Sequence, residues 1–538
     1  MPERAFCNLN IRVQAAPESI TLARFQDCAV EDDMAEREPG FTTWQQGTPA
    51  AGAAACGNAD ASRAALDILE AGGNAIDAAV AAAYVMGTVE PLDSGIGAGG
   101  FMIMHDAASG KTEAVDFLGV APMTARYDLY PSVDTDNAYI VRVKGRENER
   151  GHRSVAVPGS VRGLGEAQAK FGRLAMADVL APAIALAEGG FRVGHKAALR
   201  MARTEALLNL TEATRKLLLK PDGSLYRAGE AMANPEYGQS LRMIAKDGPD
   251  CFYKGALADR LLAEMAAHDG FLDRADLENY EAIWRAPATA RFRGHDVATM
   301  PPPSSGGLVF AGLAALERES VTDGAHYDLL AGAMLEMFRK RAAGYGDPAF
   351  VSMAGESSET TSLAVIDRQG NAACITYSNN NHSGVVLPGT GILLNNQMML
   401  FSPWPGNPNE VVGGKRPVSS MMPSLMFRDG KVRMAIGASG STRIPTSIMQ
   451  VLFNRLVLGD SLPDAVGRAR LHAETETLLA DAELEKTVAG IADARKLQLK
   501  LSPGRDPMLA SVQAVAVNDD GTVAAVGDPR AKASGMVR

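Results

Sequence analysis

The stretch that most restricts the fold is residues 360–378, which read TTSLAVID, RQG and NAACITYS in turn. Both flanking segments are rich in apolar and β-branched residues, which favour strands, and the segment between them contains a glycine. They predict a β-hairpin whose first strand starts at Thr360. Residues 155–345 have mostly helical apolar spacing, whereas further strand patterns follow the hairpin at 384–398 and 423–440. A helix-rich part followed by a strand-rich part indicates an α+β fold with sheets packed between helices.

Composition and charge narrow the class of protein. The 538 residues are 46% hydrophobic and 22% charged, which suits a globular protein with a sizeable core. The formal net charge of −10 argues against nucleic acid or an anionic membrane as a partner, because both need a concentrated basic face. Five scattered cysteines without a CxxC pair point to a reducing compartment. Eight dispersed histidines without an HxxxH pattern predict no metal site, and we expect no cofactor.

The N-terminal residues are polar and aperiodic, and we expect an irregular extension over 1–45. They carry charges throughout, so they lack the apolar segment of a signal peptide, and no run of eighteen apolar residues follows. These features predict a cytoplasmic protein. Helices are expected again at about 446–470 and 490–500.

Three glycines, Gly95, Gly97 and Gly100, formally match the G-x-G-x-x-G pattern of dinucleotide-binding proteins. That pattern requires a strand before it and a helix after it, so that the phosphate meets a helix N-terminus. Here a helical pattern precedes the glycines and a strand pattern over 101–105 follows them. The glycines are therefore expected to let two backbone segments approach each other in a tight, buried turn.

Taken alone, the hydroxyl-rich segments have ordinary structural explanations. Residues 359–361 read as a turn running into a strand. Ser378 and Asn380 lie at an expected strand end, where serine and asparagine commonly form turns. The serine pair at 419–420 could cap a helix. The segment GASGS at 437–441 fails the G-x-S-x-G pattern of a serine nucleophile, because its second glycine falls one position early.

Nine sequence blocks nevertheless occur in one order between residues 72 and 444. They read GGNAIDAAVAAAYVMGTVEPLDSGIGAGGFMI, VAVPGSVRGL, PAIALAEGGF, MPPPSSGG, YGDP, TT with GNAACITYS, SGVVLPGTGILLNNQM, KRPVSSMMPS and GASGSTRI. Together these blocks resemble the γ-glutamyltranspeptidase family. Two later segments, ARLHAE (469–474) and GDPR (527–530), resemble the arginine-histidine element and the short DPR segment near the end of that family's chains.

The resemblance implies an N-terminal-nucleophile hydrolase with a four-layer αββα sandwich. Such a protein is made as one inactive chain that cuts itself once, like a zymogen. The matching cut lies between Glu359 and Thr360. It would leave a large subunit over 46–359, after the extension, and a small catalytic subunit over 360–538, and the two would build the fold together. The implied partners are these two fragments and a small-molecule amide.

The implied nucleophile has a physical reason to stand at a new N-terminus. A threonine hydroxyl is a weak nucleophile at neutral pH and needs a nearby base. A freed α-amino group has a pKa of about 7.7–8.0, against about 10.4 for lysine, so it is partly neutral near pH 7. Thr360 would then supply both the nucleophile, through its hydroxyl, and the general base, through its own amine.

The resemblance also assigns the other site residues. Ser378 stands where the family has a threonine bonded to the amine of the nucleophile. Gly440 and Ser441 stand where two consecutive glycines of the family form an oxyanion hole with their N–H groups. The implied substrate-binding residues are Asn380, Gln397, Ser419, Ser420, Leu118 and Leu400.

Three departures from the family pattern affect specificity and processing. Leu118 replaces an arginine that pairs with the α-carboxylate of a γ-glutamyl group, and Met399 and Leu400 replace two aspartates, one of which holds its α-ammonium. Such charge-assisted bonds contribute about 1.5–3 kcal/mol each. We therefore expect an acyl group without an α-amino-acid head, either apolar or singly charged, with the basic pair at 415–416 available for one carboxylate. Directly after the threonine pair, where the family usually has a histidine, this chain has Ser362.

Three functions remain open at this stage. The first is a self-processing amidohydrolase or acyltransferase with altered acyl specificity. The second is a γ-glutamyltransferase or glutathione hydrolase, in which unidentified residues hold the head group. The third is a catalytically silent scaffold, against which the retained Thr360, Ser378 and Asn380 argue.

Overall fold

The computed structural model describes residues 43–131, 143–317, 325–344 and 360–538, and for 342–344 only the backbone. The expected N-terminal extension lies outside these residues, apart from 43–45, where the first strand begins. The expected cut site lies at their edge, because Thr360 is described and Glu359 is not.

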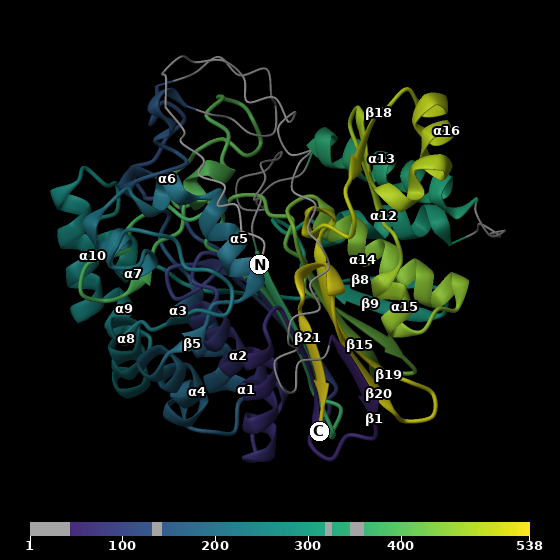
Figure 1. Cartoon of the computed structure of the whole chain (residues 1–538), viewed down its shortest axis with the longest axis horizontal. Coiled ribbons are helices and arrows are strands. Elements are labelled where there is room, and N and C mark those ends of the chain that lie inside the picture. The colour runs from purple at the N-terminus through teal and green to yellow at the C-terminus, as the bar shows by residue number, and fades with distance from the viewer. Residues whose placement is uncertain (1–42, 132–142, 318–324, 345–359) are drawn as a thin grey trace, which may run out of the picture. The chain divides into compact units, whose positions relative to one another are not determined.

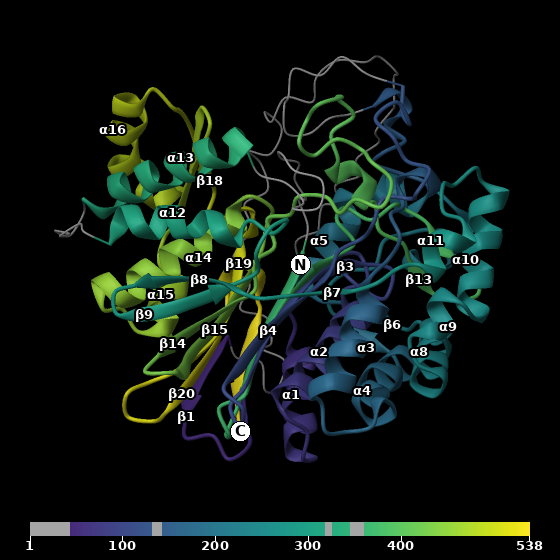
Figure 2. The ribbon, with the colours of Figure 1, turned by 180° about the vertical axis from the view of Figure 1, so that it is seen from behind.

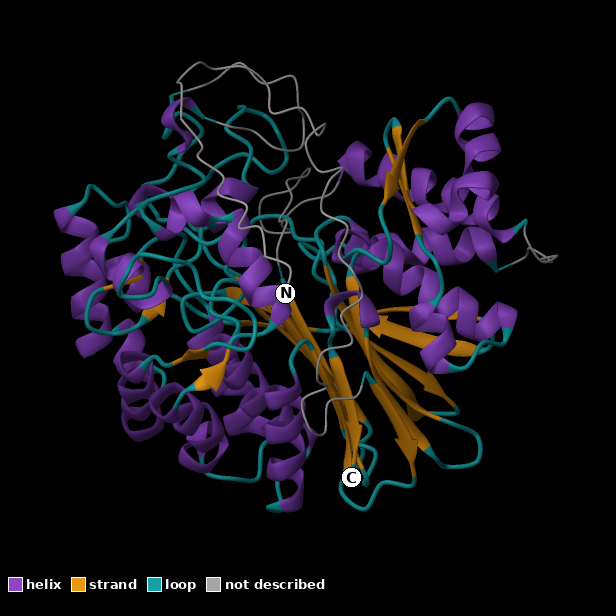
Figure 3. Ribbon diagram, viewed as in Figure 1, coloured by secondary structure: helices purple, strands orange, loops and turns teal. Residues whose placement is uncertain are grey.

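Two antiparallel seven-stranded sheets form the centre of the fold (Figure 3). Sheet A has the order β1 (Trp44–Gly47), β20 (Val523–Gly527), β19 (Ser511–Val517), β15 (Lys431–Ser439), β14 (Ser424–Arg428), β9 (His295–Thr299) and β8 (Ala288–Phe292). Sheet B has the order β21 (Ser534–Val537), β2 (Gly52–Cys56), β10 (Thr361–Asp367), β11 (Ala372–Ser378), β3 (Gly99–Asp106), β4 (Lys111–Phe117) and β7 (Ile283–Arg285). Each sheet takes strands from both sides of position 360.

Helices cover the outer face of each sheet, as opposite views show (Figures 1 and 2). Sheet B packs against α1 (Ala59–Glu70), α2 (Ala75–Val89) and α3 (Ser160–Phe171). Sheet A packs against α12 (Gly306–Leu316), α14 (Arg443–Phe453) and α15 (Leu462–Gly467), with α13 (His326–Gly344) beside α12. The inner faces of the sheets meet where β10 and β11 lie against β15. The predicted αββα sandwich is confirmed.

The remaining elements surround these layers. They are α4 (Met176–Gly189), β5 (Phe191–Arg192), α5 (His195–Arg203), α6 (Glu205–Leu208), α7 (Glu212–Leu218), β6 (Ala231–Met232), α8 (Pro235–Asp247), α9 (Asp250–Tyr253), α10 (Ala256–Ala267), α11 (Arg274–Glu278), β12 (Val386–Leu387), β13 (Ile392–Leu393), β16 (Leu471–Glu474), β17 (Thr477–Asp481), α16 (Glu485–Arg495) and β18 (Gln498–Ser502). Among the described residues, none of the helices combines the length and the apolar character needed to cross a membrane.

The hairpin β10–β11 is confirmed, and it occupies the centre of sheet B with Thr361 opposite Tyr377. Alternate residues of β10 enter different cores. Leu363 and Val365 face the layer of α1 and α2, whereas Ala364 and Ile366 face sheet A. Burial on both faces explains why this segment is apolar throughout.

Sequence reasoning missed one group of strands. Strands β7, β8 and β9 lie within 283–299, inside the part expected to be mostly helical, and most of their side chains are at least partly exposed, so they lack a continuous apolar run. Tertiary packing overrides local propensity here. Helices do occupy most of 446–470, as expected, and a π-helical turn over Asn454–Leu458, which ends at Gly459 with a left-handed φ of 77°, separates α14 from α15.

The glycine-rich turn after α2 brings backbones together, as predicted. A Cβ on Gly97 would collide with the carbonyl oxygen of Leu393, and one on Gly99 would lie 2.9 Å from the carbonyl carbon of Leu118. A Cβ on Gly100 would lie 2.5 Å from the Cα of Tyr377, its neighbour on β11. The turn is therefore a packing feature of sheet B, and the segment after it is a strand.

Gly437 on β15 sets the spacing between the sheets opposite the start of β10, and its replacement should destabilise the fold. A Cβ there would overlap Ser362 Oγ and lie 2.9 Å from Cys374 Sγ. We expect Gly437→Ala to lower the free energy of unfolding by about 2–3 kcal/mol, the usual effect of overpacking a core. Urea unfolding measures it, with Gly490→Ala as the control, because Gly490 lies on α16 with open space around its Cα. Equal stability of the two variants would contradict this prediction.

Candidate active site

Thr360 is the residue immediately before β10, the central strand of sheet B. It is 2% exposed, and its Oγ1 has no hydrogen-bond partner among the described residues. Buried hydroxyls are nearly always bonded, so an unbonded one requires an explanation. A hydroxyl that is kept available for chemistry provides that explanation.

The next two side chains are engaged. Ser94 Oγ donates to Thr361 Oγ1 at 3.1 Å. Ser362 Oγ donates to the carbonyl of Ile375 at 3.2 Å and lies 3.2 Å from Thr376 Oγ1. These bonds fix the start of β10. Ser362, which replaces the family's histidine, is thus a structural residue between the sheets.

The end of β11 brings two predicted residues together. The backbone N–H of Asn380 donates to Ser378 Oγ at 2.7 Å, which fixes the serine hydroxyl at the strand end. Asn380 has a left-handed φ of 60°, a conformation that asparagine tolerates. Its Nδ2 donates to the carbonyl of Asn396 at 3.3 Å, while its buried Oδ1 has no partner within the described chain. That oxygen is available to accept a hydrogen bond from a ligand.

Gln397 supports this strand end from behind. Its Nε2 donates to the carbonyls of Ser378 at 2.7 Å and Gly99 at 3.3 Å, and its Oε1 accepts from the N–H of Gly119 at 2.8 Å. Both amide hydrogens are therefore used by the backbone, and the residue is fully buried. This geometry gives Gln397 a positioning role; its predicted contact with substrate stays a prediction.

The serine pair does not cap a helix, because the next element is strand β14. Ser419 Oγ accepts from the N–H of Met421 at 3.2 Å, and its backbone pairs with Ser304. Ser420 is buried, and its Oγ lacks a partner among the residues that the structure describes. Ser420 therefore resembles Thr360 and Asn380 in having an unused buried polar atom.

Gly440 and Ser441 connect β15 to the N-terminus of α14. Gly440 has φ 137°, and a Cβ there would lie 2.7 Å from the Cα of Ala510. Ser441 keeps the left-handed φ of 60° that a glycine adopts easily, at a strain of about 1–2 kcal/mol. Ser441 therefore adopts a conformation that a glycine could also adopt; its role in an oxyanion hole stays a prediction. The adjacent helix N-terminus favours negative charge.

Leu118 and Leu400 are both buried, and Leu118 belongs to the apolar core between the sheets. The expectation that Lys415 and Arg416 are available to bind a substrate carboxylate is wrong. Lys415 Nζ donates to the carbonyls of Pro408 at 2.7 Å and Glu410 at 3.2 Å. Arg416 pairs with buried Asp116 at 3.3 Å. Both cations serve the local structure, so neither is free to bind a substrate carboxylate.

A buried charge cluster holds the loop next to Ser378. Lys196 Nζ lies 2.7 Å from Asp93 and 3.0 Å from Glu90. The carbonyl of Asp93 accepts from the N–H of Asn379 at 2.9 Å. Burial raises the pKa of Glu90 to about 7, against the attraction of Lys196. No sequence pattern indicated this support, because α5 and the loop are far apart along the chain.

His382, in the loop after Asn380, should make stability depend on acid. Burial, helped by Arg200, lowers the pKa of His382 to about 3, and its Nδ1 accepts from the N–H of Gly384. The unfolded chain protonates this ring below about pH 6.5, so its stabilising effect is complete above that pH and is lost as the pH falls toward 3. We expect a loss of about 2–3 kcal/mol between pH 6.5 and 4.5. The pH slope of the urea midpoint should be shallower for His382→Gln; identical slopes would contradict the assignment.

Two late sequence elements meet in a buried ion cluster. Arg470 of ARLHAE lies 2.8 Å from Asp528 of GDPR. Arg530 lies 2.6 Å from Asp481 and 3.4 Å from Asp528. The carboxylate of Asp528 also accepts a hydrogen bond from the backbone N–H of Val512, at the start of β19. The cluster therefore joins two segments that are about 60 residues apart in the sequence.

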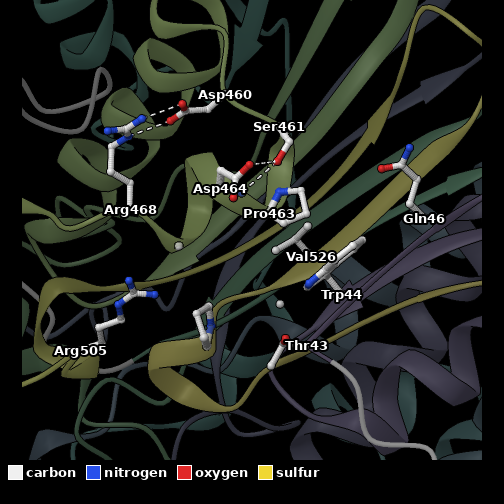
Figure 4. Close-up of a pocket in the computed structure, with 13 residues that line it drawn as sticks. Thr43, Trp44, Gln46, Asp460, Ser461, Pro463, Asp464, Arg468, Arg505 and Val526 are labelled. Carbon is white, nitrogen blue, oxygen red and sulfur yellow. Dashed lines mark hydrogen bonds and ion pairs between the residues drawn. The ribbon is translucent and has the colours of Figure 1, made fainter. Parts of the chain in front are cut away.

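A pocket of about 130 Å³ adjoins Thr360. Its lining comes from α5, the end of β15, the start of α14 and the segments around 508 and 530, and it includes Gly440. A larger cavity of about 760 Å³ is lined by none of the predicted site residues (Figure 4). Two pairs of its polar groups bond to each other, Asp460 with Arg468 at 2.6 and 2.7 Å and Ser461 with Asp464 (Figure 4). Of these two cavities, only the smaller one is lined by predicted site residues, namely Thr360 and Gly440.

One group of described side chains could hold a metal ion, although the sequence predicted none. His152 lies 2.8 Å from Glu264, which lies 3.4 Å from His268. These residues are on a short 3₁₀ turn and at the end of α10, and none of them lines the pocket at Thr360. The sequence separation of His152 from the other two explains why no motif is visible.

The four-layer αββα sandwich, with a buried threonine at the start of a central strand, is the architecture of N-terminal-nucleophile hydrolases. A family model described as Gamma-glutamyltranspeptidase matches residues 61–356 and 353–537. The chain belongs to the gamma-glutamyltranspeptidase family and is an enzyme of that family, an amide hydrolase or acyltransferase.

Individual relatives cover most of the chain. The "Acylase ACY 1 proenzyme" of Pseudomonas sp. (strain V22) is 34% identical over 525 residues, covering 89% of this chain and 93% of the relative. The "Glutathione hydrolase proenzyme" of Escherichia coli (strain K12) is 30% identical, covering 88% and 89%. A cephalosporin acylase structure from Bacillus halodurans has the same fold, with a TM-score of 0.82, 24% identity and coverage of 94% and 98%.

Proposed function

We propose that this enzyme cuts its own chain between Glu359 and Thr360 and then hydrolyses a small-molecule amide through an acyl–Thr360 intermediate. The observation that carries the proposal is the Oγ1 of Thr360, buried and without a hydrogen-bond partner among the described residues, in the wall of a pocket at the start of a central strand. The proenzyme names of the two relatives support a processed product.

The cut supplies the base. In the uncut chain the nitrogen of Thr360 is an amide and cannot accept a proton. After the cut it is an amine of pKa about 7.7–8.0. The amine takes the hydroxyl proton as Oγ1 bonds to the substrate carbonyl carbon, and the N–H groups of Gly440 and Ser441 stabilise the resulting oxyanion. The carbon–nitrogen bond then breaks, and the leaving amine departs with the proton.

Water completes the cycle. It gives a proton to the α-amine while its oxygen bonds to the acyl carbon, and the ester bond to Oγ1 breaks. The carboxylic acid leaves and the threonine hydroxyl is restored. An amine that replaces water gives a new amide, which is the transfer reaction. Either route predicts ping-pong kinetics.

The acyl group is proposed to lack an α-amino-acid head. Leu118 and Leu400 are buried and apolar at the positions of the family's charged clamp, and Lys415 and Arg416 are engaged elsewhere. A free glutamyl head would lose its hydration against leucine without compensation, which is unfavourable. Asn380 Oδ1 and Ser420 Oγ remain as neutral hydrogen-bonding groups for the acyl chain.

The test has two stages. Intact-mass measurement and N-terminal sequencing of the purified protein should give a small fragment that begins Thr-Thr-Ser; a single uncut, inactive chain would favour the silent scaffold. A panel of anilides should then show faster turnover for plain acyl groups than for γ-glutamyl. Efficient γ-glutamyl turnover would instead establish the glutathione-hydrolase alternative, which the relative from Escherichia coli represents.

A further inference from the structure

The pocket at Thr360 is strongly basic. Six of its fourteen lining residues are His195, Lys196, Arg200, Arg203, Arg443 and Arg530, and none is acidic. None of the residues assigned to acyl binding lines it. The pocket is therefore a second binding region beside the nucleophile, built by α5 and the start of α14 rather than by the β11 loop.

Four of these six groups are accounted for by the protein itself. Lys196 is paired with both Glu90 and Asp93, and Arg200 with Asp93. Arg530 is paired with Asp481 and Asp528. Burial, together with nearby Lys532, lowers the pKa of His195, so its ring is neutral near pH 7. These groups shape the pocket without leaving an excess charge.

The other two carry uncompensated charge. Arg203, exposed at the end of α5, has no acidic partner among the described residues, and neither has Arg443, half-buried at the first turn of α14. The Nε of Arg443 donates to the carbonyl of Met508 at 3.0 Å, and its two terminal nitrogens have no partner in the part of the chain that the structure describes. The planar guanidinium group matches a carboxylate in geometry and charge, and the start of α14 adds a positive partial charge.

We infer that Arg203 and Arg443 form a carboxylate subsite, so that the enzyme acts on amides that carry a carboxylate near the scissile bond. The inference rests on the proposed function and narrows its substrate class. It also explains where an anionic substrate binds in a chain that lacks the family's clamp arginine at Leu118 and engages Arg416 with Asp116. The carboxylate can belong to the acyl group or to the amine. The acyl group contains the carbon that Thr360 attacks in the proposed mechanism, and the amine is bonded to that carbon, so both lie close to Thr360.

Two substrate pairs separate these sources. Glutaryl anilide and pentanoyl anilide differ only in a terminal carboxylate on the acyl side. Pentanoylglycine and pentanoyl methylamide differ in one on the amine side. In at least one of the two pairs, the wild-type enzyme should have a higher kcat/KM for the member with the carboxylate. That pair shows whether the carboxylate belongs to the acyl group or to the amine. Arg203→Gln or Arg443→Gln should reduce that preference by about tenfold to a hundredfold. Arg215→Gln, an exposed arginine of α7 without a described ion pair, should leave it unchanged.

A binding measurement keeps the test independent of turnover. Glutarate and N-acetylglycine are added to the processed protein, and at least one should raise the melting temperature of the wild type and of Arg215→Gln more than that of Arg203→Gln or Arg443→Gln. The inference is overturned if neither charged substrate is preferred and neither anion stabilises the protein, or if the arginine variants leave both readouts unchanged. Failure of the proposed function differs: no Thr-Thr-Ser fragment forms and no amide is hydrolysed.

Discussion

Replacing Thr360 with alanine should leave the protein as one uncut chain of 56.6 kDa with no amide hydrolysis. In the proposed mechanism, the substitution removes the attacking oxygen of both the self-cut and the turnover, and it also prevents formation of the α-amine that would serve as base. We expect activity to fall by at least about 10⁴-fold, as when a nucleophile is deleted from a unit of interdependent groups. A denaturing gel, intact mass and an anilide assay measure these outcomes.

Two neighbouring variants make the Thr360 result interpretable. Thr360→Ser keeps an oxygen in the same place and should retain processing at a reduced rate. Thr361→Ala removes the bond from Ser94, and should still be cut, with a loss of stability of about 1 kcal/mol. Normal processing of Thr360→Ala, or a block in Thr361→Ala alone, would show that the nucleophile lies elsewhere.

Replacing Asp528 with alanine should have the largest effect on stability. Its side chain is fully buried and lies within ion-pair distance of Arg470 and Arg530, both almost completely buried. Removal leaves two buried guanidinium groups with Asp481 as the nearest carboxylate. Breaking a buried pair in this way costs about 3–5 kcal/mol, because an uncompensated charge stays in the interior.

The measurement is urea unfolding in the Thr360→Ala background, in which the expected single chain cannot separate into fragments. Asp67→Ala is the matched control, because Asp67 is an exposed carboxylate paired with exposed Arg538 at 2.6 Å. Exposed pairs contribute about 0–1 kcal/mol. If the two variants lose the same stability, the cluster of Arg470 and Asp528 does not hold the C-terminal segments together.

Local pattern was sufficient where both the cause and the effect lie within one segment. The apolar and β-branched residues around the RQG loop predicted the hairpin β10–β11, whereas its place at the centre of sheet B is seen only in the fold. The alanine-rich helix α2 is buried along its whole length, and its one internal charge, Asp77, forms a capping box with Asn74 inside the same segment. The glycine-rich turn was recognised as a packing feature because its flanking elements stand in the wrong order for phosphate binding.

The sequence by itself therefore determined the hairpin, the α+β class and, through its ordered blocks, the family; these depend on short-range periodicity and on fixed motifs. Only the tertiary structure decided which polar groups are engaged. Lys415 and Arg416 look free along the chain, yet they bond to groups that the fold brings to them, whereas Arg203 and Arg443, 240 residues apart, share a pocket with uncompensated charge. These hydrogen bonds and ion pairs form over a few ångströms between segments that are distant in the sequence, so no local sequence pattern predicts them.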